Sequence, residues 1–195
     1  MKAIWLSDIH FEFLHGPEIR EFLGELDEIQ ANAVLISGDI AQASSVAFSL
    51  RQMQDQLGVP IYFVLGNHDF YHGSISEVRS AIRCLTNECS GLHWLSICGA
   101  IRLTYRTSLV GHDGWGDGRL GDYEKSRVQL NDFRLIKELS GLGRKEMLQR
   151  LMQLGDEAAK HLGAVLPEAL ANSEHVIVVT HVPPFTEASW YDGRY

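Results

Sequence analysis

Four short apolar runs in this chain each end in side chains that can bind a metal ion, and this feature constrains the fold more than any other. The runs span residues 2–6, 33–37, 61–65 and 176–179, and each has the character of a buried strand. One apolar run with a polar tip is ordinary. Four such runs with Asp, His and Asn at their ends predict a metal site built at one edge of a sheet. The four clusters are Asp8-Ile9-His10, Gly38-Asp39, Gly66-Asn67-His68-Asp69 and Thr180-His181.

Amphipathic helices are predicted between the first three runs. Apolar residues recur at intervals of three and four within residues 18–29 and 46–57, which is the spacing of one helix face. A third helix is expected after Ser74, because Ser74 and Glu77 have the spacing of a capping box. Strands separated by helices of this length pair in parallel through right-handed crossovers. Open α/β sheets bind ligands at the carboxyl ends of such strands.

The middle of the chain has a different pattern, with close spacing that favours hairpins over crossovers. We predict one α/β domain of mixed sheets. Short strand-like runs occur at residues 92–95, 97–103 and 107–110. A glycine-rich loop follows at residues 111–119. Two helical patterns come next, at about 123–140 and 144–172.

The composition fits one ordinary globular domain. The chain of 195 residues can bury a sizeable core, and its 45% hydrophobic and 22% charged residues are average. No apolar stretch approaches the ~20 residues of a membrane-spanning helix, and no signal-peptide pattern precedes the first strand. The three cysteines lack CxxC spacing, which indicates buried reduced thiols rather than a disulfide framework. We therefore expect a cytoplasmic protein, and the sequence leaves its oligomeric state open.

The net charge of −8 argues against a broad nucleic-acid-binding surface, because phosphate backbones attract clustered Lys and Arg. It does not exclude a smaller phosphate-bearing substrate. Two bound divalent cations would bring about four positive charges into a pocket, and local chemistry responds to these more than to the overall charge. We therefore expect a small-molecule phosphate ester as the substrate and not a long nucleic acid.

The residue types in the four clusters suit a pair of metal ions. Residues i and i+2 of an extended segment project to the same side, so Asp8 and His10 can hold one ion together. The two oxygens of Asp39 can bridge two ions, and Asn67 and His181 add an oxygen and a nitrogen. Such ligands without thiolate suit Mn, Fe or Zn. Two ions about 3.5–4 Å apart can clamp a phosphoryl group and acidify a water, which predicts hydrolysis by a metal-bound hydroxide.

In their order along the chain, these clusters resemble the motifs of the calcineurin-like metallophosphoesterases. The Gly-Asn-His-Asp motif after a strand is the most specific element, and the resemblance extends over nearly the whole chain. It implies an α/β fold, a four-layer sandwich of two mixed β-sheets flanked by helices, with a dinuclear metal centre at one edge. The matching motifs are Asp8-x-His10, Gly38-Asp39, Gly66-Asn67-His68-Asp69 and Thr180-His181-Val182-Pro183-Pro184.

The resemblance also implies roles for individual residues. His68 would not bind metal but would donate a proton to the leaving oxygen and, with Asn67, contact the phosphate. Catalysis would therefore depend on His68 and on the bridging Asp39, while Asp69 would support the loop. The metal ligands would be Asp8 and His10 for the first ion, Asn67 and His181 for the second ion, and Asp39 between the two.

Two departures from the family pattern matter. Many members carry an acidic residue three positions after the bridging aspartate, where it orients the catalytic histidine; here that position is Gln42, so His68 has no obvious charged partner. The family also closes with Gly-His-x-His, which supplies one ligand to each ion. Residues 111–114 match this element only in part and precede His181. We therefore expect the single domain of residues 1–195 to be C-terminally incomplete.

The glycine-rich loop at residues 111–119 can either join two layers or form a lip over the pocket. As a lip, it would let Trp115 contact a leaving group and Arg119 a phosphate oxygen. The aromatic and basic residues near the end of the sequence would border the same cleft; these are Trp190, Tyr191 and Arg194.

The leading hypothesis is a metal-dependent phosphoric ester hydrolase, either a phosphomonoesterase or a phosphodiesterase. The alternative is a catalytically inactive protein of the same fold that serves as a scaffold for protein interaction. His68 favours the enzyme, because a scaffold has no evident need for a proton donor at that position. The residues alone identify neither the substrate nor the metal.

Overall fold

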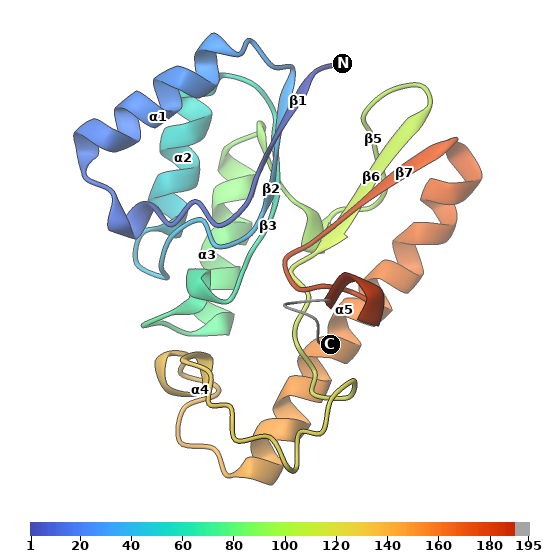
Figure 1. Cartoon of the computed structure of the whole chain (residues 1–195). Helices are drawn as coiled ribbons and strands as arrows, with labels where there is room; N and C mark the ends of the chain where they lie inside the picture. Colours follow the sequence, from blue (N-terminus) through green and yellow to red (C-terminus); the bar gives the residue numbers. More distant parts are fainter. Residues whose placement is uncertain (190–195) are drawn as a thin grey trace.

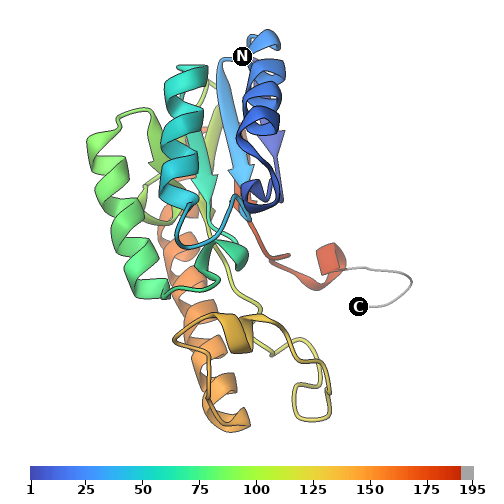
Figure 2. The same ribbon diagram turned by 90° about the vertical axis from the view of Figure 1, so that its left-hand side faces the viewer.

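A parallel sheet carries three helices on one face and packs on a second sheet with its other face (Figure 1). The computed structural model describes residues 1–189. In spatial order, the first sheet consists of β1 (Ala3–Leu6), β2 (Ala33–Ser37), β3 (Ile61–Val64) and β4 (Leu92–Trp94). The helices on its outer face are α1 (Gly16–Glu28), α2 (Val46–Leu57) and α3 (Ile75–Glu88), which Figure 2 shows from that side.

The second sheet combines both strand directions. Its strands are β5 (Ile101–Arg102), β6 (Thr107–His112) and β7 (His175–Thr180), where β6 is antiparallel to β5 and parallel to β7. The long helix α5 (Arg144–Asn172) lies on its outer face, and the short α4 (Asp132–Leu135) lies beyond the ends of the strands (Figure 1). Two sheets flanked by helices confirm the predicted four-layer sandwich. Single 3₁₀ turns occur at Phe11–Phe13, His68–Phe70, Leu95–Ile97 and Thr186–Ser189.

Alternating side chains of β2 join the layers, because successive residues of a strand point to opposite faces. Val34 and Ile36 belong to the core that packs under the helices, together with Leu23 of α1. Leu35 instead packs in the core between the sheets, with Leu109 of β6. Burial of each such side chain stabilises the fold by about 1.5–3 kcal/mol relative to exposure. These contacts fix the ends of the strands, and therefore the loops that follow them.

Local hydrogen bonds set the helix boundaries. The backbone N–H of Glu77 donates to Ser74 Oγ at the start of α3 (3.3 Å), which is one half of the predicted capping box. The Glu77 carboxylate instead accepts from Lys137 Nζ (3.5 Å). Helix α2 ends at Gly58, whose φ of 63° is in the left-handed region that glycine adopts readily. The three helices predicted for the first half of the chain are confirmed.

The predictions for the middle of the chain hold only in part. The predicted hairpin forms between β5 and β6, which pair antiparallel, but β4 pairs in parallel with β3 because α3 forms the crossover between them. The sequence also predicts a helix over residues 123–140, where the structure forms turns and the single helical turn α4. The Asp122 carboxylate accepts a hydrogen bond from the backbone N–H of Lys125 (3.1 Å), and such local bonds compete with helix formation.

The cysteines are free, as expected, but they are not buried: Cys84 is exposed on α3, and Cys89 and Cys98 are half-buried. Cys84 lies between Ile82 and Leu85 in the sequence, but those two side chains are buried on the inner face of the helix and that of Cys84 is not. Within the part of the chain that the structure describes, no helix has the length and apolar character needed to cross a bilayer.

Candidate metal centre

The polar clusters of the sequence meet where four strands end. Asp8 and His10 follow β1, Asp39 follows β2, Asn67 follows β3, and His181 follows β7 of the second sheet. Parallel neighbouring strands end at the same edge of a sheet, which brings the first three clusters together. The packing of the two sheets adds the fourth. The site is therefore built on loops that a buried core holds in place.

The loops after β1 and β2 run side by side in an unusual backbone conformation. The backbone N–H of Asp8 donates to Gly38 O (3.2 Å), and that of His10 donates to Asp39 O (3.1 Å). Asp8, His10 and Asp39 have φ angles of 53°, 53° and 52°. A non-glycine residue in this left-handed region can cost about 1–3 kcal/mol, and such residues concentrate at functional sites.

Two glycines let these loops approach one another. A Cβ atom on Gly38 would lie 2.6 Å from His181 Nδ1 and 2.7 Å from the backbone nitrogen of Gly66. A Cβ atom on Gly66 would lie only 2.1 Å from Asp39 Oδ1. Any larger side chain at either position would displace a residue of the site, which explains glycine at both strand ends.

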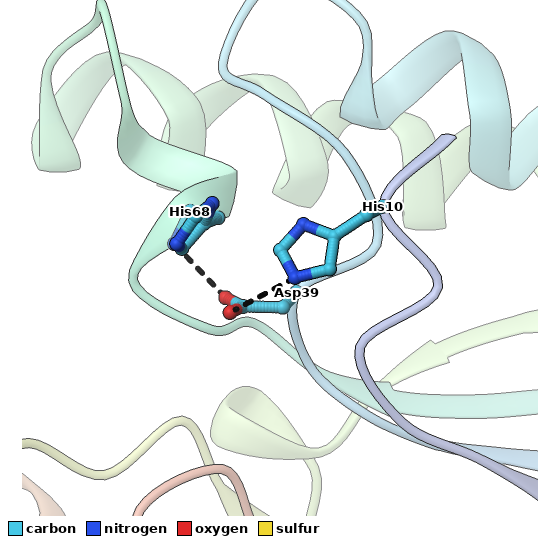
Figure 3. A group of neighbouring side chains, drawn as sticks. All are labelled: His10, Asp39 and His68. Carbon is cyan, nitrogen blue, oxygen red and sulfur yellow. Dashed lines mark hydrogen bonds and ion pairs between the residues drawn. The ribbon is translucent and has the colours of Figure 1, made fainter. Parts of the chain in front are cut away.

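The carboxylate of Asp39 is at the centre of the site (Figure 3). Its Oδ2 lies 3.8 Å from His10 Nε2, and its Oδ1 lies 3.4 Å from His181 Nε2. The backbone N–H of His68 donates to Oδ1 (2.9 Å) and fixes the orientation of the carboxylate. Ligand atoms of His10, Asp39 and His68 all lie within 4.8 Å of one another. Asp39 thus faces one histidine with each oxygen, which is the arrangement a bridging ligand requires.

Three atoms that can bind a metal ion converge beside His181. Its Nδ1 lies 2.8 Å from Ser37 O, which can only accept, so Nδ1 carries a proton and Nε2 is the nitrogen that can offer a lone pair to a metal ion. That Nε2 faces Asn67 Oδ1 at 3.1 Å and Asp39 Oδ1 at 3.4 Å. A divalent cation between these three atoms would accept a lone pair from each of them. The residues therefore fit a metal ion at this position.

The amide of Asn67 is held with its oxygen toward this point. Its Nδ2 donates to Asp132 Oδ1 (2.9 Å) and to the hydroxyl of Tyr71 (3.1 Å), and that hydroxyl donates to Asp132 (2.7 Å). Burial and the bond to Asp132 raise the pKa of the Tyr71 phenol well above its ordinary value, so the hydroxyl stays protonated. Asp132 and Tyr71 are members of the site that the sequence interpretation missed, and no local pattern signals Asp132, 65 residues from Asn67.

His68 is packed between aromatic neighbours. Its ring stacks on Tyr71 with centroids 4.2 Å apart and meets the ring of His10 edge-on at 4.6 Å. Its Nδ1 lies 3.8 Å from Oε1 of Glu12, a third residue that the sequence interpretation missed. The sequence feature that could have identified Glu12 is its position two residues after the predicted ligand His10. His68 lies within reach of the metal site, and its predicted role as a proton donor stays a prediction.

Asp69 braces two of the loops. Its Oδ1 accepts from the backbone N–H groups of Ile40 and Ala41 (2.9 Å each), and its Oδ2 accepts from that of Gly66 (2.8 Å). Complete burial raises the pKa of Asp69, and these three hydrogen bonds oppose that rise because they favour the charged form. The carboxylate ties the loop after β2 to the loop after β3, as expected of a residue that supports the site.

Other predicted residues lie outside this cluster. Asp8 is exposed, its carboxylate accepts a hydrogen bond from Ser7 Oγ, and it is not a member of the group formed by His10, Asp39 and His68. Arg119 is bonded to Asp117 (2.7 Å) and Asp156 (2.8 Å). Metal binding by Asp8 and phosphate binding by Arg119 stay predictions. The residues expected to border the cleft near the end of the sequence, Trp190, Tyr191 and Arg194, lie outside the described residues.

A cavity of about 490 Å³ opens beside Asn67 and His181. Trp115 of the glycine-rich loop lines it, as do Leu151 of α5 and Asp132 of α4. The cavity gives a small molecule access to one side of Asn67 and places Trp115 at the pocket, where the sequence predicts a lip.

Comparison with known proteins identifies relatives over much of the chain. The family model for calcineurin-like phosphoesterases matches residues 1–195. Two UDP-2,3-diacylglucosamine hydrolases come from strains of Stenotrophomonas maltophilia. One is 34% identical over 103 residues, which cover 46% of this chain and 41% of the relative. The other is 32% identical over 149 residues, which cover 68% of this chain and 54% of the relative. A metallophosphoesterase of Helicobacter pylori is 29% identical over 110 residues, 51% and 29% of the two chains. The chain thus spans about half or less of the length of these relatives.

Solved structures share the fold. A phosphopantetheinyl hydrolase from Mycobacterium tuberculosis superposes with a TM-score of 0.66 at 13% identity, covering 93% of this chain and 68% of the other. A dimetal phosphatase from Danio rerio superposes with a TM-score of 0.53 at 14% identity, covering 94% and 70%. Identities this low establish similarity of fold alone.

Proposed function

Because the chain belongs to the calcineurin-like phosphoesterase family, we propose that it is a metal-dependent hydrolase of phosphate esters with two divalent ions at its centre. The convergence of Asp39, Asn67 and His181 on one point is the observation that carries this proposal. Each of these groups can offer an oxygen or nitrogen lone pair to a metal ion, and His10 offers another nitrogen on the far side of Asp39. A carboxylate between two such sets is what a dinuclear centre needs.

The proposed ligands follow from these positions. His10, Asp8 and Asp39 would hold the first ion, and Asn67, His181 and Asp39 would hold the second. Asp8 would have to turn its carboxylate away from Ser7 Oγ, from which it accepts a hydrogen bond. Mn, Fe and Zn all suit these oxygen and nitrogen donors. When bound, such ions polarise a phosphoryl group and lower the pKa of a coordinated water.

His68 acts in this proposal as the proton donor to the leaving oxygen. Its backbone N–H holds Asp39, and its ring is confined between Tyr71 and His10. A histidine positioned in this way can protonate a leaving alkoxide without rearrangement of the loop. Asn67 contacts the phosphate beside it, and the adjoining cavity accommodates the rest of the substrate.

A small-molecule phosphate ester is the proposed substrate, cleaved in the cytoplasm. The net charge of −8 disfavours a long nucleic acid. The relatives named for UDP-2,3-diacylglucosamine and the structural neighbour named as a phosphopantetheinyl hydrolase are consistent with small substrates.

The test is metal-stimulated hydrolysis by the full-length protein. After removal of bound metal, p-nitrophenyl phosphate and bis(p-nitrophenyl) phosphate are assayed with and without added Mn²⁺, and the preferred ester distinguishes a monoesterase from a diesterase. We expect turnover that depends on metal and is lost in Asp39→Asn. Asp55→Asn, which removes the same charge from the exposed side of α2, serves as the control. A folded wild-type protein without metal-stimulated turnover would contradict the proposal and favour the scaffold alternative.

A further inference from the structure

Glu12 is a largely buried acid beside two histidines of the site. Its side chain is 9% exposed, and its Oε1 lies 3.0 Å from His10 Nδ1 and 3.8 Å from His68 Nδ1. Its other oxygen, Oε2, is buried and has no hydrogen-bond partner among the described residues. The two imidazole rings meet edge-on at 4.6 Å, so one carboxylate reaches both of them.

The burial of Glu12 is not explained by stability. A buried carboxylate oxygen without a partner is costly, and a polar residue on a short turn is normally solvated. In the same turn Phe13 is 72% exposed, so the chain buries an acid and exposes a phenyl ring. Residues whose burial or exposure costs folding free energy in this way are expected at functional sites.

We propose that Glu12 is a positioning residue of this site, which holds the imidazole of His10 for metal binding and that of His68 for proton transfer. This inference rests on the function proposed above. Glu12 also supplies the charged partner of His68 that the sequence lacks at position 42, where the side chain is the neutral amide of Gln42. Glu12 Oε1 faces His68 Nδ1 instead.

The contact with His10 fixes which nitrogen faces the metal. Glu12 Oε1 accepts from Nδ1–H, so Nε2 is the ring nitrogen directed toward Asp39 Oδ2, 3.8 Å away, and is the one left for a metal ion. Carboxylates that orient a metal-binding histidine in this way affect metal affinity or activity by about 10–100-fold.

The contact with His68 is longer and acts on the orientation of the ring. At 3.8 Å, Glu12 Oε1 and His68 Nδ1 are beyond hydrogen-bond distance in this structure. Hydrogen bonds of catalytic groups are often long without substrate and shorten in the reacting complex. Glu12 therefore keeps His68 oriented with Nδ1 toward the carboxylate and Nε2 free for the leaving oxygen.

Two substitutions separate these roles. In Glu12→Gln the amide oxygen still accepts from His10, but the negative charge beside His68 is lost. In Glu12→Ala both contacts are lost. Glu21→Gln, on the exposed side of α1, removes the same charge far from the site and is the matched control. Thermal unfolding of each variant verifies that it is folded.

The first measurement is Mn²⁺ affinity of the full-length protein by titration calorimetry, which does not depend on turnover. We expect Glu12→Ala to bind Mn²⁺ about 10–100-fold more weakly than wild type, and Glu12→Gln and Glu21→Gln to stay within about threefold. The second is kcat with phenyl phosphate, a poor leaving group, relative to 2,4-dinitrophenyl phosphate, which needs no proton donor. We expect Glu12→Gln to lower kcat for phenyl phosphate about tenfold more than for the dinitrophenyl ester.

Wild-type Mn²⁺ affinity in Glu12→Ala together with equal loss on both esters in Glu12→Gln would overturn the assignment, because a merely structural residue lowers both rates alike. If the wild-type protein hydrolyses neither ester, the proposed function fails, and the Mn²⁺ affinity of Glu12→Ala alone then decides whether Glu12 positions His10.

Discussion

Replacement of Gly66 by alanine introduces a methyl group where the carboxylate of Asp39 lies. The new Cβ would be 2.1 Å from Asp39 Oδ1 and 2.5 Å from the Asp39 backbone nitrogen, whereas Cβ atoms essentially never approach a neighbour within 3.0 Å. The difference, 3.0 minus 2.1, requires a movement of about 0.9 Å. Overpacking of this kind costs about 1–3 kcal/mol, and a misplacement of about 1 Å in a catalytic site can lower the rate about 100-fold.

The assay compares unfolding free energy, Mn²⁺ affinity and kcat of Gly66→Ala with those of wild type. Gly24→Ala is the control, because its Cβ would have no neighbour within 4 Å and alanine in a helix is more stable than glycine by about 0.5–1 kcal/mol. We expect Gly24→Ala to be slightly stabilised and fully active, and Gly66→Ala to be destabilised and to bind Mn²⁺ weakly. Wild-type metal affinity and rate in Gly66→Ala would refute the argument that Gly66 sets the position of Asp39.

Three further predictions concern single carboxylates. Asp69→Asn should lower the unfolding free energy by about 1–3 kcal/mol, because the amide must turn a donor toward one of three backbone N–H donors; unchanged stability in a urea titration would contradict this. Asp132→Ala should weaken Mn²⁺ binding about 10–100-fold by releasing the amide of Asn67, whereas an affinity equal to wild type would show that Asn67 needs no such support. Glu138 accepts hydrogen bonds from the backbone N–H groups of Ile75 and Ser76 (2.9 Å each) at the start of α3. Burial raises the pKa of Glu138, but the hydrogen bonds outweigh it and hold that pKa below its ordinary value. The folded state therefore binds this proton less tightly than the unfolded state, and the stabilisation is present above the unfolded pKa and lost as the pH falls through the folded pKa. Glu138→Gln should lose about 0.5–1 kcal/mol at pH 7 and little at acidic pH; a pH-independent loss would count against this reasoning.

The sequence predicts the site's main elements because parallel strands carry their loops to one edge. Asp39 and Asn67 each follow an apolar run, and the run itself places them. The predicted helices of the first half are confirmed for a similar reason: α1 and α2 have an apolar stripe and α3 has a local start signal, which are all properties of neighbouring residues.

The features that the sequence does not predict depend on contacts between distant residues. Glu12 reaches His68 only because the left-handed φ of His10 turns the chain back toward the site. Asp132 accepts a hydrogen bond from Asn67, but it lies in a segment whose apolar pattern predicts a helix and which forms few helical turns. The spacing of apolar residues does not predict a contact between these two residues. The parallel pairing of β4 likewise depends on α3 crossing over the sheet rather than on the residues of β4.

The measurement that tests the central claim most directly is an anomalous-diffraction map of a Mn²⁺-soaked crystal of the full-length protein. The account predicts two peaks about 3.5–4 Å apart, one between Asp39 and His10 and the other among Asp39, Asn67 and His181. A map with no peak beside Asp39, or with one ion bound elsewhere, would contradict it.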